Sequence, residues 1–184
     1  GILRELRAGE LLVLMAALSI AVASMTAIGF LTDRISRAVA LQATEVLAAD
    51  LRLSGGRPLA AARLAEAQEA GLETSYGINF PSVVFSEQTS TLAALKAVSA
   101  GYPLRGELRI ADRLFETPRL AEQIPAPGTV YADAALLARL GIDVGAQIEV
   151  GALVLTVTQV LVYRPDQNPG FSGLAPTLLM HVDD

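Results

Sequence analysis

An uncharged and mostly apolar run from Leu11 to Leu31 constrains the fold of this chain more than any other feature. At about 1.5 Å per residue, a helix over this run is about 31 Å long, close to the roughly 30 Å hydrocarbon thickness of a bilayer. Core helices of soluble domains are usually shorter. The run therefore predicts one transmembrane helix, with the lipid bilayer around it.

A cleaved export signal is the main alternative for this run. Leu11–Ile20 could serve as its apolar core, and Ala21-Val22-Ala23 resembles a small-residue cleavage site. However, two glutamates balance the two arginines ahead of the run, and apolar residues continue to Leu31. These features favour an uncleaved anchor. The positive-inside rule does not orient it, because the arginines on its two sides are equal in number.

Three small residues, Ser19, Ala23 and Ala27, recur every four positions within the apolar run. In a helix this spacing places them on one face, where small side chains let a neighbouring membrane helix approach closely. They are the candidate helix-packing residues. The alternative is that they reflect only the high alanine content of the segment.

The helix is predicted to continue beyond the membrane as a stalk, because neither Gly nor Pro occurs between Gly29 and Ser54. A separate amphipathic helix packed on its own domain is the alternative. The predicted organisation is an N-terminal segment with the transmembrane helix (1–32), a stalk helix (33–50) and an extracytoplasmic domain (51–184). Since the sequence starts at Gly1 rather than Met and ends without a closing element, we expect a segment of a longer protein with an incomplete domain.

Composition excludes several classes of function. The net charge of −5 and the lack of a basic cluster argue against nucleic acid as a partner, since its binding requires Lys and Arg at the phosphates. Hydrophobic residues make up 52% of the chain and aromatic residues 5%, so the core must be built mainly from aliphatic side chains. The chain has no cysteine, which excludes disulfides and thiolate chemistry.

The extracytoplasmic part is predicted to be mixed α and β. Its first half reads as a strand at Leu51–Leu53, a helix from Pro58 to Ala70, and an alternating strand from Leu72 to Phe80. Pro81 is then expected to break the register, so that Val83–Phe85 continues after a bulge or as an edge. For Thr91–Val98, helix propensity and short length point in opposite directions, and both helix and strand stay open.

The second half contains clearer local signals. Residues 117–128 are rich in proline and predict an irregular connection. Asp133 is placed to cap a short helix over Ala134–Leu140, which Gly141 ends. Residues 147–150 and 153–163 flank Gly151-Ala152 and predict a β-hairpin, after which Arg164–Gly173 forms a loop.

No catalytic, cofactor or metal site can be argued from the residues. The one histidine, His181, lies among apolar residues near the end of the sequence, and a structural role is favoured for it. One His and no Cys cannot provide the ligands that zinc requires. Gly55-Gly56 lacks the spacing and the Lys of a phosphate-binding loop. The remaining candidate is a turn that is either a structural loop or an interaction loop: Gly101, Tyr102, Pro103, Arg105 and Gly106.

The order of several short motifs resembles the N-terminal region of YbbP-like permeases, which are ABC transporter membrane subunits of the FtsX/MacB family. The resemblance covers nearly the whole chain, and the motifs that carry it are Arg7-Ala8-Gly9-Glu10-Leu11, Ile28-Gly29-Phe30 with Asp33-Arg34, Ala49-Asp50-Leu51, Phe80-Pro81-Ser82, Lys96-Ala97-Val98-Ser99, Gly101–Gly106, Leu140-Gly141 with Val144-Gly145, and Leu174-Ala175-Pro176. Such permeases carry more of the periplasmic domain and further membrane helices after this region.

The resemblance implies an α+β chain: one transmembrane helix, its stalk, and a domain of the MacB periplasmic core type in which Thr91–Val98 is a strand. It also implies the bacterial inner membrane, a cytoplasmic N-terminus and a periplasmic domain. The subunit itself would be non-catalytic, and a separate ABC ATPase subunit would bind ATP. Some relatives act beside a lysophospholipase-like esterase in handling hydrophobic compounds at the membrane.

The function that follows from the resemblance is mechanotransmission, in which ATP hydrolysis in the partner moves the periplasmic domain, with extraction or export of hydrophobic or lipid-like compounds as the task. A stiff helix suits this role, whereas a flexible linker would lose the motion. The alternative is a membrane-anchored sensor. The sequence after Asp184 separates the two, since a permease has further apolar spans while a sensor has a second span and a signalling domain. A secreted hydrolase is disfavoured, because the sequence offers no general base.

Overall fold

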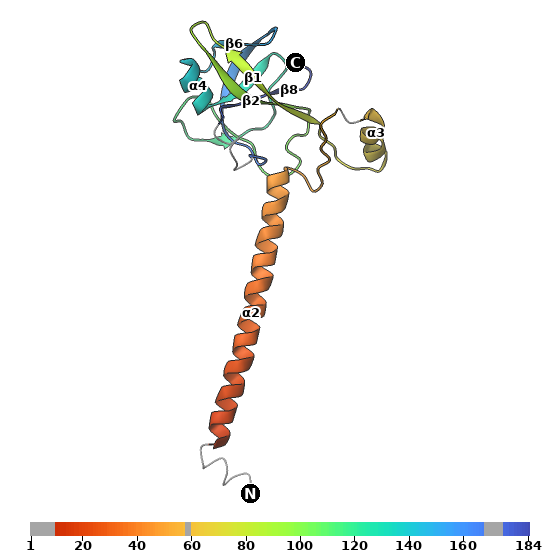
Figure 1. The fold of residues 1–184 in the computed structure, drawn as a ribbon, viewed down its shortest axis with the longest axis vertical. Helices are drawn as coiled ribbons and strands as arrows, with labels where there is room; N and C mark the ends of the chain where they lie inside the picture. The colour runs from red at the N-terminus through yellow and green to blue at the C-terminus, as the bar shows by residue number, and fades with distance from the viewer. Residues whose placement is uncertain (1–9, 58–59, 168–174) are drawn as a thin grey trace. The chain divides into compact units, whose positions relative to one another are not determined.

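The computed structural model describes residues 10–57, 60–167 and 175–184. The chain divides into two compact units, Gly1–Ala43 and Thr44–Asp184. The α2 helix (Glu10–Leu47) accounts for the described part of the first unit and the first residues of the second (Figure 1).

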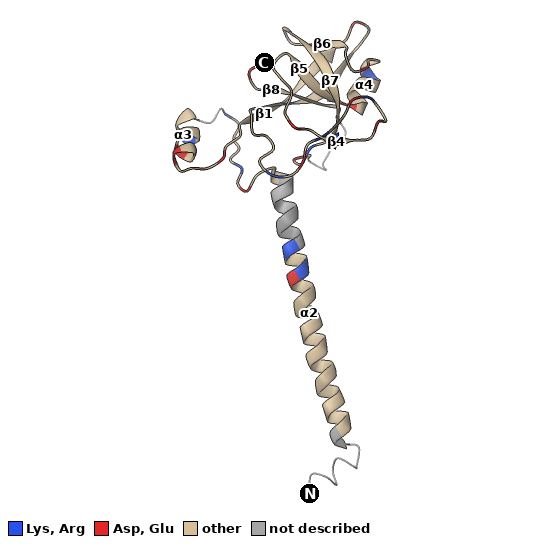
Figure 2. Cartoon of the chain, turned by 180° about the vertical axis from the view of Figure 1, so that it is seen from behind, with Lys and Arg blue, Asp and Glu red and all other residues tan. Residues whose placement is uncertain are grey.

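The apolar side chains of α2 between Leu12 and Arg37 are not buried. Every residue from 12 to 37 is exposed, and Leu12–Arg37 is the one stretch of the described chain that is long and apolar enough to cross a membrane by length and composition. Figure 2 shows a long uncharged section of this helix. The hydroxyl groups of Thr26 and Thr32 donate hydrogen bonds to the carbonyls of Val22 and Ile28, so these polar groups are satisfied within the helix. Such a surface is stable in lipid, where backbone and side-chain polar groups must be paired internally.

The described residues of the second unit form eight strands in one sheet, in the order β4-β3-β7-β5-β8-β2-β1-β6. Their bounds are β1 Gly77–Phe85, β2 Ser90–Val98, β3 Arg109–Ala111, β4 Arg119–Leu120, β5 Thr129–Asp133, β6 Gln147–Val150, β7 Leu153–Tyr163 and β8 Thr177–His181. β6 pairs with both β1 and β7, so six of the strands close into a ring, β7-β5-β8-β2-β1-β6. We call these six strands the closed ring.

β7 joins the closed ring to the two short strands outside it. Its residues Thr156–Leu161 pair with β5 on one edge, while its other edge is shared by β6 at one end and β3 at the other. This sharing is possible because β7 is the longest described strand, with 11 residues, and β6 and β3 are short.

The hydrophobic core lies on both faces of the sheet, and strand alternation decides which residue faces which way. Inward positions of the ring form one cluster, to which β2 contributes Leu95 and Ala97 and β8 contributes Leu178 and Met180. Positions of opposite parity form a second cluster on the outer face, which includes Val98 and Leu179. Burying both faces of β2 and β8 explains why they are apolar almost throughout.

The helix α4 (Ala134–Leu140) completes the inner core. Asp133 caps it by accepting a hydrogen bond from the Leu136 amide at 2.7 Å, and Gly141 ends it with a left-handed φ of 64°. Its buried leucines, Leu136, Leu137 and Leu140, belong to the same cluster as the inward residues of the ring. The predicted cap, helix and stop are confirmed, as is the hairpin of β6 and β7.

The sheet decides the ambiguous segment Thr91–Val98 in favour of strand. β2 pairs with β1 on one side and β8 on the other, and this pairing outweighs the helix propensity of its residues. The strand implied by the family resemblance is therefore confirmed. β3, β5 and β8 were not predicted; each is a short apolar strand that the long-range pairing defines.

Pro81 does not break the register of β1. The pairing with β2 continues through it without a bulge, and the amide of Ser99 donates to the Tyr76 carbonyl, so even-numbered positions of β1 bond toward β2. The nitrogen of Pro81 faces the other side, where β6 pairs only with Val84 and Phe85. Both predicted alternatives for Val83–Phe85 are therefore wrong, because the strand continues without a bulge and Val84 and Phe85 pair with both β2 and β6. Pro81 itself is tolerated because its nitrogen faces a position where no donor is needed.

The segment before β1 differs most from the prediction. Leu51–Leu53 is not a strand, since no neighbouring strand pairs with it, and the alternating run becomes a strand only from Gly77. The predicted helix is α3 (Ala61–Glu69), which has no buried residues, and positions 58–59 lie outside the described residues.

In the predicted irregular connection 117–128, Arg119–Leu120 pairs as β4. Positions 168–173 of the predicted loop also lie outside the described residues.

Candidate functional site

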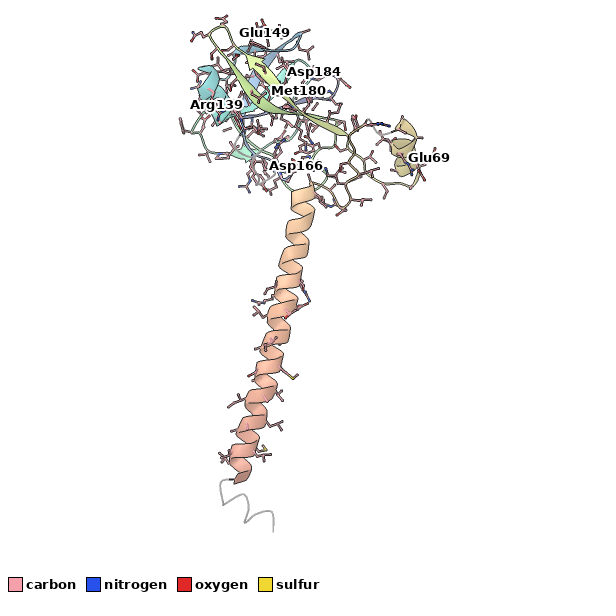
Figure 3. The ribbon with its side chains drawn as sticks, viewed as in Figure 1. Glu69, Arg139, Glu149, Asp166, Met180 and Asp184 are labelled. Atoms are coloured by element: carbon pink, nitrogen blue, oxygen red, sulfur yellow. The ribbon has the colours of Figure 1, made fainter. Side chains whose placement is uncertain are left out.

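A buried ion pair on the outer face of the sheet is the centre of the candidate site. Lys96 of β2 lies in register with Leu179 of β8, at a position of opposite parity to the inward Leu95 and Ala97. Its Nζ atom contacts a carboxylate oxygen of Asp166, which follows β7, and the two side chains are only 7% and 4% exposed. Figure 3 labels Asp166 within the second unit. Removing two charged groups from water costs free energy, so each of these buried groups needs the opposite charge of the other.

Tyr102 completes this network from the loop after β2. Its hydroxyl donates a hydrogen bond to the second carboxylate oxygen of Asp166 at 2.5 Å, and the Lys96 ammonium lies 4.5 Å from the ring centroid. Burial raises the pKa of the Tyr102 hydroxyl to about 12, so it remains a donor at neutral pH. The Tyr102–Pro103 peptide bond is cis. The network thus fastens the loop to the sheet.

Positive charges gather around the ion pair. Burial lowers the pKa of Lys96 to about 7, and the neighbouring guanidinium groups of Arg164 and Arg52 act in the same direction. The contact with the Asp166 carboxylate opposes this shift, and we assign the ammonium form to Lys96 because that carboxylate is in direct contact with it. Arg164 is mostly buried, with its Nε 4.0 Å from Asp166 and lacking a hydrogen-bond partner within the described part of the chain.

The same loop also holds the segment that follows α2. The guanidinium group of Arg105 binds the Asp50 carboxylate through two contacts, Nε–Oδ1 at 3.1 Å and Nη2–Oδ2 at 2.7 Å. The Arg105 amide donates to the carbonyl of Ala48 at 3.0 Å. Ala48 is buried and has a left-handed φ of 56°, the conformation that commonly ends a helix.

A cavity of about 480 Å³ lies beside this network within the second unit. Its wall includes Lys96, Tyr102 and Asp166, together with residues 47–49, 51–57 and 75–79. The wall therefore combines exposed apolar side chains with several cations and one buried carboxylate. Such a space can hold a small molecule.

The structure brings together part of the predicted interaction loop and leaves the other candidates apart from it. Tyr102 and Pro103 are partly buried, whereas Gly101, Arg105 and Gly106 are exposed, and Arg105 is engaged with Asp50. In α2, Ser19, Ala23 and Ala27 are exposed at four-residue spacing on one helical face. Nothing in the described residues contacts that face as a second helix would, and helix packing stays a prediction.

The remaining sequence candidates do not form a catalytic or metal centre. His181 ends β8 and accepts a hydrogen bond from the Asp183 amide at 3.2 Å. Within the described residues, no group of three or more His, Asp and Glu side chains is arranged to hold a metal ion.

The sequence reasoning missed Lys96 and Asp166. The one signal was a lysine within a mostly apolar strand, which requires a buried partner if both faces are covered.

Comparison with known proteins gives a homologue for nearly the whole chain. The uncharacterized ABC transporter permease YbbP of Escherichia coli (strain K12) is 33% identical over 181 residues, which cover 98% of this chain and 22% of YbbP. The chain thus spans about a fifth of the length of this relative. The predicted resemblance to YbbP-like permeases is confirmed. No protein-family model matches the chain.

Among solved structures, the periplasmic region of MacB from Actinobacillus actinomycetemcomitans is similar to this chain. The match has a TM-score of 0.43 and 11% sequence identity, and it covers 65% of this chain and 54% of that one.

Proposed function

We propose that this chain is the N-terminal part of the membrane subunit of an ABC transporter. The observation that carries the proposal is the permease homologue that matches the chain almost from end to end. The exposed apolar surface of Leu12–Arg37 supports it, because a helix of this kind requires lipid around it. The subunit is non-catalytic, and a separate ABC ATPase subunit hydrolyses ATP. It resides in the bacterial inner membrane, with the N-terminus in the cytoplasm and residues 51–184 in the periplasm.

The proposed mechanism is mechanotransmission. ATP hydrolysis in the partner moves α2, and α2 moves the sheet domain. Two observations support this route: α2 is one helix from Glu10 to Leu47, and the loop around Arg105 holds the residues directly after it through a two-contact ion pair and a backbone hydrogen bond. The proposed task is extraction or export of hydrophobic or lipid-like compounds, with a lysophospholipase-like esterase as a further partner.

The rigidity of α2 tests this mechanism in the full-length assembly with its ATPase. Replacing Glu45-Val46 by Gly-Pro places a proline in the last turn of α2, where it removes a helical hydrogen bond and disfavours the helical conformation of the residue before it. We expect ATP hydrolysis to continue while ATP-driven transport falls sharply. The matched control replaces the same two residues by Ala-Ala, which preserves the helix and should preserve transport. Unchanged transport with Gly-Pro would exclude transmission through a rigid helix.

The proposed orientation can be tested because the chain has no cysteine of its own. A single cysteine is placed at the exposed Glu69 of α3 or, in a second variant, at Arg4. A membrane-impermeant maleimide added to cells with a permeabilised outer membrane should label the first variant and not the second. Labelling of position 4 alone would reverse the orientation, and equal labelling of both in soluble protein would exclude the membrane assignment.

A membrane-anchored sensor is the second candidate, and the cavity beside Lys96 is the observation that favours it. A sensor requires a ligand site in the domain outside the membrane, whereas mechanotransmission does not. The full-length protein separates the two candidates: a permease co-purifies with an ATPase subunit and stimulates its ATP hydrolysis, while a sensor does neither.

A further inference from the structure

The cavity beside Lys96 has more positive than negative charge in its wall. Arg52, Arg57 and Lys96 line it, and Asp166 is the one acidic residue in the described lining. Asp166 is already engaged by Lys96 and by the Tyr102 hydroxyl. Within residues 10–57, 60–167 and 175–184, no carboxylate forms an ion pair with Arg52 or Arg57. Two cations at the cavity therefore lack a counter-charge from the described protein.

A further guanidinium group adds to this excess. The Nε atom of Arg164 lies 4.0 Å from Asp166, and this buried atom has no hydrogen-bond partner among the described atoms. Arg52 lies close enough to Lys96, Tyr102 and Arg164 to interact with all three electrostatically. The local field therefore favours an anion, and a partly enclosed site strengthens that field compared with open water.

Part of the wall is apolar. Leu51, Leu53 and Ile78 line the cavity and remain exposed, with Leu51 85% exposed. Exposed leucines that lie together beside a cavity gain free energy when an apolar group covers them. The wall thus offers two different surfaces within one space of about 480 Å³, which is the size of a small-molecule site.

We infer that this cavity binds an organic anion with an apolar tail, whose carboxylate or phosphate head lies against Arg52 and Arg57 and whose tail covers Leu51, Leu53 and Ile78. Arg52 and Arg57 donate charge-assisted hydrogen bonds to the head, and the Lys96–Asp166–Tyr102 network forms the fixed floor of the site. The inference does not rest on the transport role, because binding is a property of this chain alone.

The test measures binding by titration calorimetry on the whole chain in zwitterionic nanodiscs, with empty nanodiscs as the blank. The probes are octanoate and octyl phosphate, which have both parts; acetate, which has the head alone; 1-octanol, which has the tail alone; and octylammonium, which reverses the charge. We expect saturable binding of at least one anionic probe with one molecule per chain. Acetate, octanol and octylammonium should bind at least about tenfold more weakly than that anionic probe. This difference corresponds to the loss of about one charge-assisted hydrogen bond. The tighter of the two anionic probes identifies the head group.

Variants locate the site. Arg52→Gln with Arg57→Gln should weaken anion binding at least about tenfold, and Leu53→Asp should weaken it by repelling the head and disrupting the apolar wall. All three positions are exposed, so the variants should fold. Arg63→Gln and Leu72→Asp are the matched controls, because both residues are exposed and neither lines the cavity. Equal binding of octanoate and octylammonium, or anion binding that the Arg52/Arg57 variant leaves unchanged, would overturn the inference.

Discussion

The apolar residues of α2 and those of the closed ring meet opposite surroundings. Leu18 in α2 is 62% exposed, whereas Leu178 in β8 is fully buried. Both segments are rich in aliphatic residues, but in the ring the pairing of strands on both sides hides them, and in α2 no described residue covers them. The comparison teaches that aliphatic composition alone does not show whether a segment is surrounded by lipid or by protein. The length of the segment and the spacing of its polar residues do show it, since the uncharged stretch of α2 is longer than any described strand.

The largest expected effect tests the buried polar network of the ring. Asp166→Asn removes the counter-charge of Lys96 and should lower the free energy of unfolding by about 3–5 kcal/mol. Without the carboxylate, burial leaves the pKa of Lys96 depressed below its usual value, as its value of about 7 already indicates. Below the depressed pKa of Lys96, the unfolded chain binds a proton that the folded chain holds unfavourably, so the folded state is destabilised in full. This destabilisation decreases as the pH rises toward the pKa of lysine in the unfolded chain. The loss of unfolding free energy should therefore be larger at about pH 6 than at about pH 9.

Chemical denaturation of the chain in detergent at the two pH values measures this difference. Asp50→Asn is the matched control, since Asp50 pairs with Arg105 in an exposed ion pair that contributes little. Equal losses for the two variants would show that the buried pair has no special weight.

The second prediction compares the two regions directly. Leu178→Ala creates a cavity in the ring and should lower the free energy of unfolding of the sheet domain by about 2–5 kcal/mol. Leu18→Ala removes the same atoms from an exposed position in α2 and should leave that unfolding unchanged. Denaturation followed by circular dichroism in the β region measures both. A comparable loss for Leu18→Ala would mean that α2 is part of the soluble core.

The third prediction tests the surroundings of α2. Met25 lies within the apolar stretch and is 81% exposed, and Met25→Arg should cost about 2.5–3.5 kcal/mol for membrane insertion. The inserted fraction can be measured with a translocation assay in membrane vesicles. Met25→Leu keeps the apolar surface and should insert normally. If Met25→Arg inserts as well as Met25→Leu, the segment is not in contact with lipid.

The smallest expected effect concerns the surface of the sheet domain. A hydrogen bond from Arg119 lowers the pKa of Asp112 below its usual value, at an N–O distance of 2.9 Å. Arg119→Gln should therefore raise the pKa of Asp112 toward its usual value and leave the fold intact. Carboxyl-carbon NMR titration measures the shift, and an unchanged pKa would indicate that the exposed pair does not persist in solution.

The elements that sequence reasoning predicted correctly have local signals. Asp133 and Gly141 mark the two ends of α4, and Gly151-Ala152 marks the turn between β6 and β7. In contrast, β2 has the propensity of a helix, and only its pairing with β1 and β8 makes it a strand. Leu51–Leu53 shows the converse, because a strand-like sequence without a neighbouring strand does not form one.

The candidate site was harder to predict than the fold for the same reason. Lys96 and Asp166 are far apart in the sequence, and no spacing rule connects a lysine in one strand with an aspartate in a later loop. Tyr102 was identified as part of a turn, but its bond to Asp166 depends on where β7 ends. Long-range contacts of this kind arise from the packing of the sheet, which one sequence does not reveal.

The closed ring depends on its shortest strand, β6. β6 has four residues, and only Val150 and Glu149 pair with β1, at Val84 and Phe85. If those few hydrogen bonds open, the closed ring becomes an open sheet without the loss of any other strand pair. Amide protons at this seam should exchange with solvent sooner than those between β2 and β8, and this is where the domain can loosen first while its core stays packed.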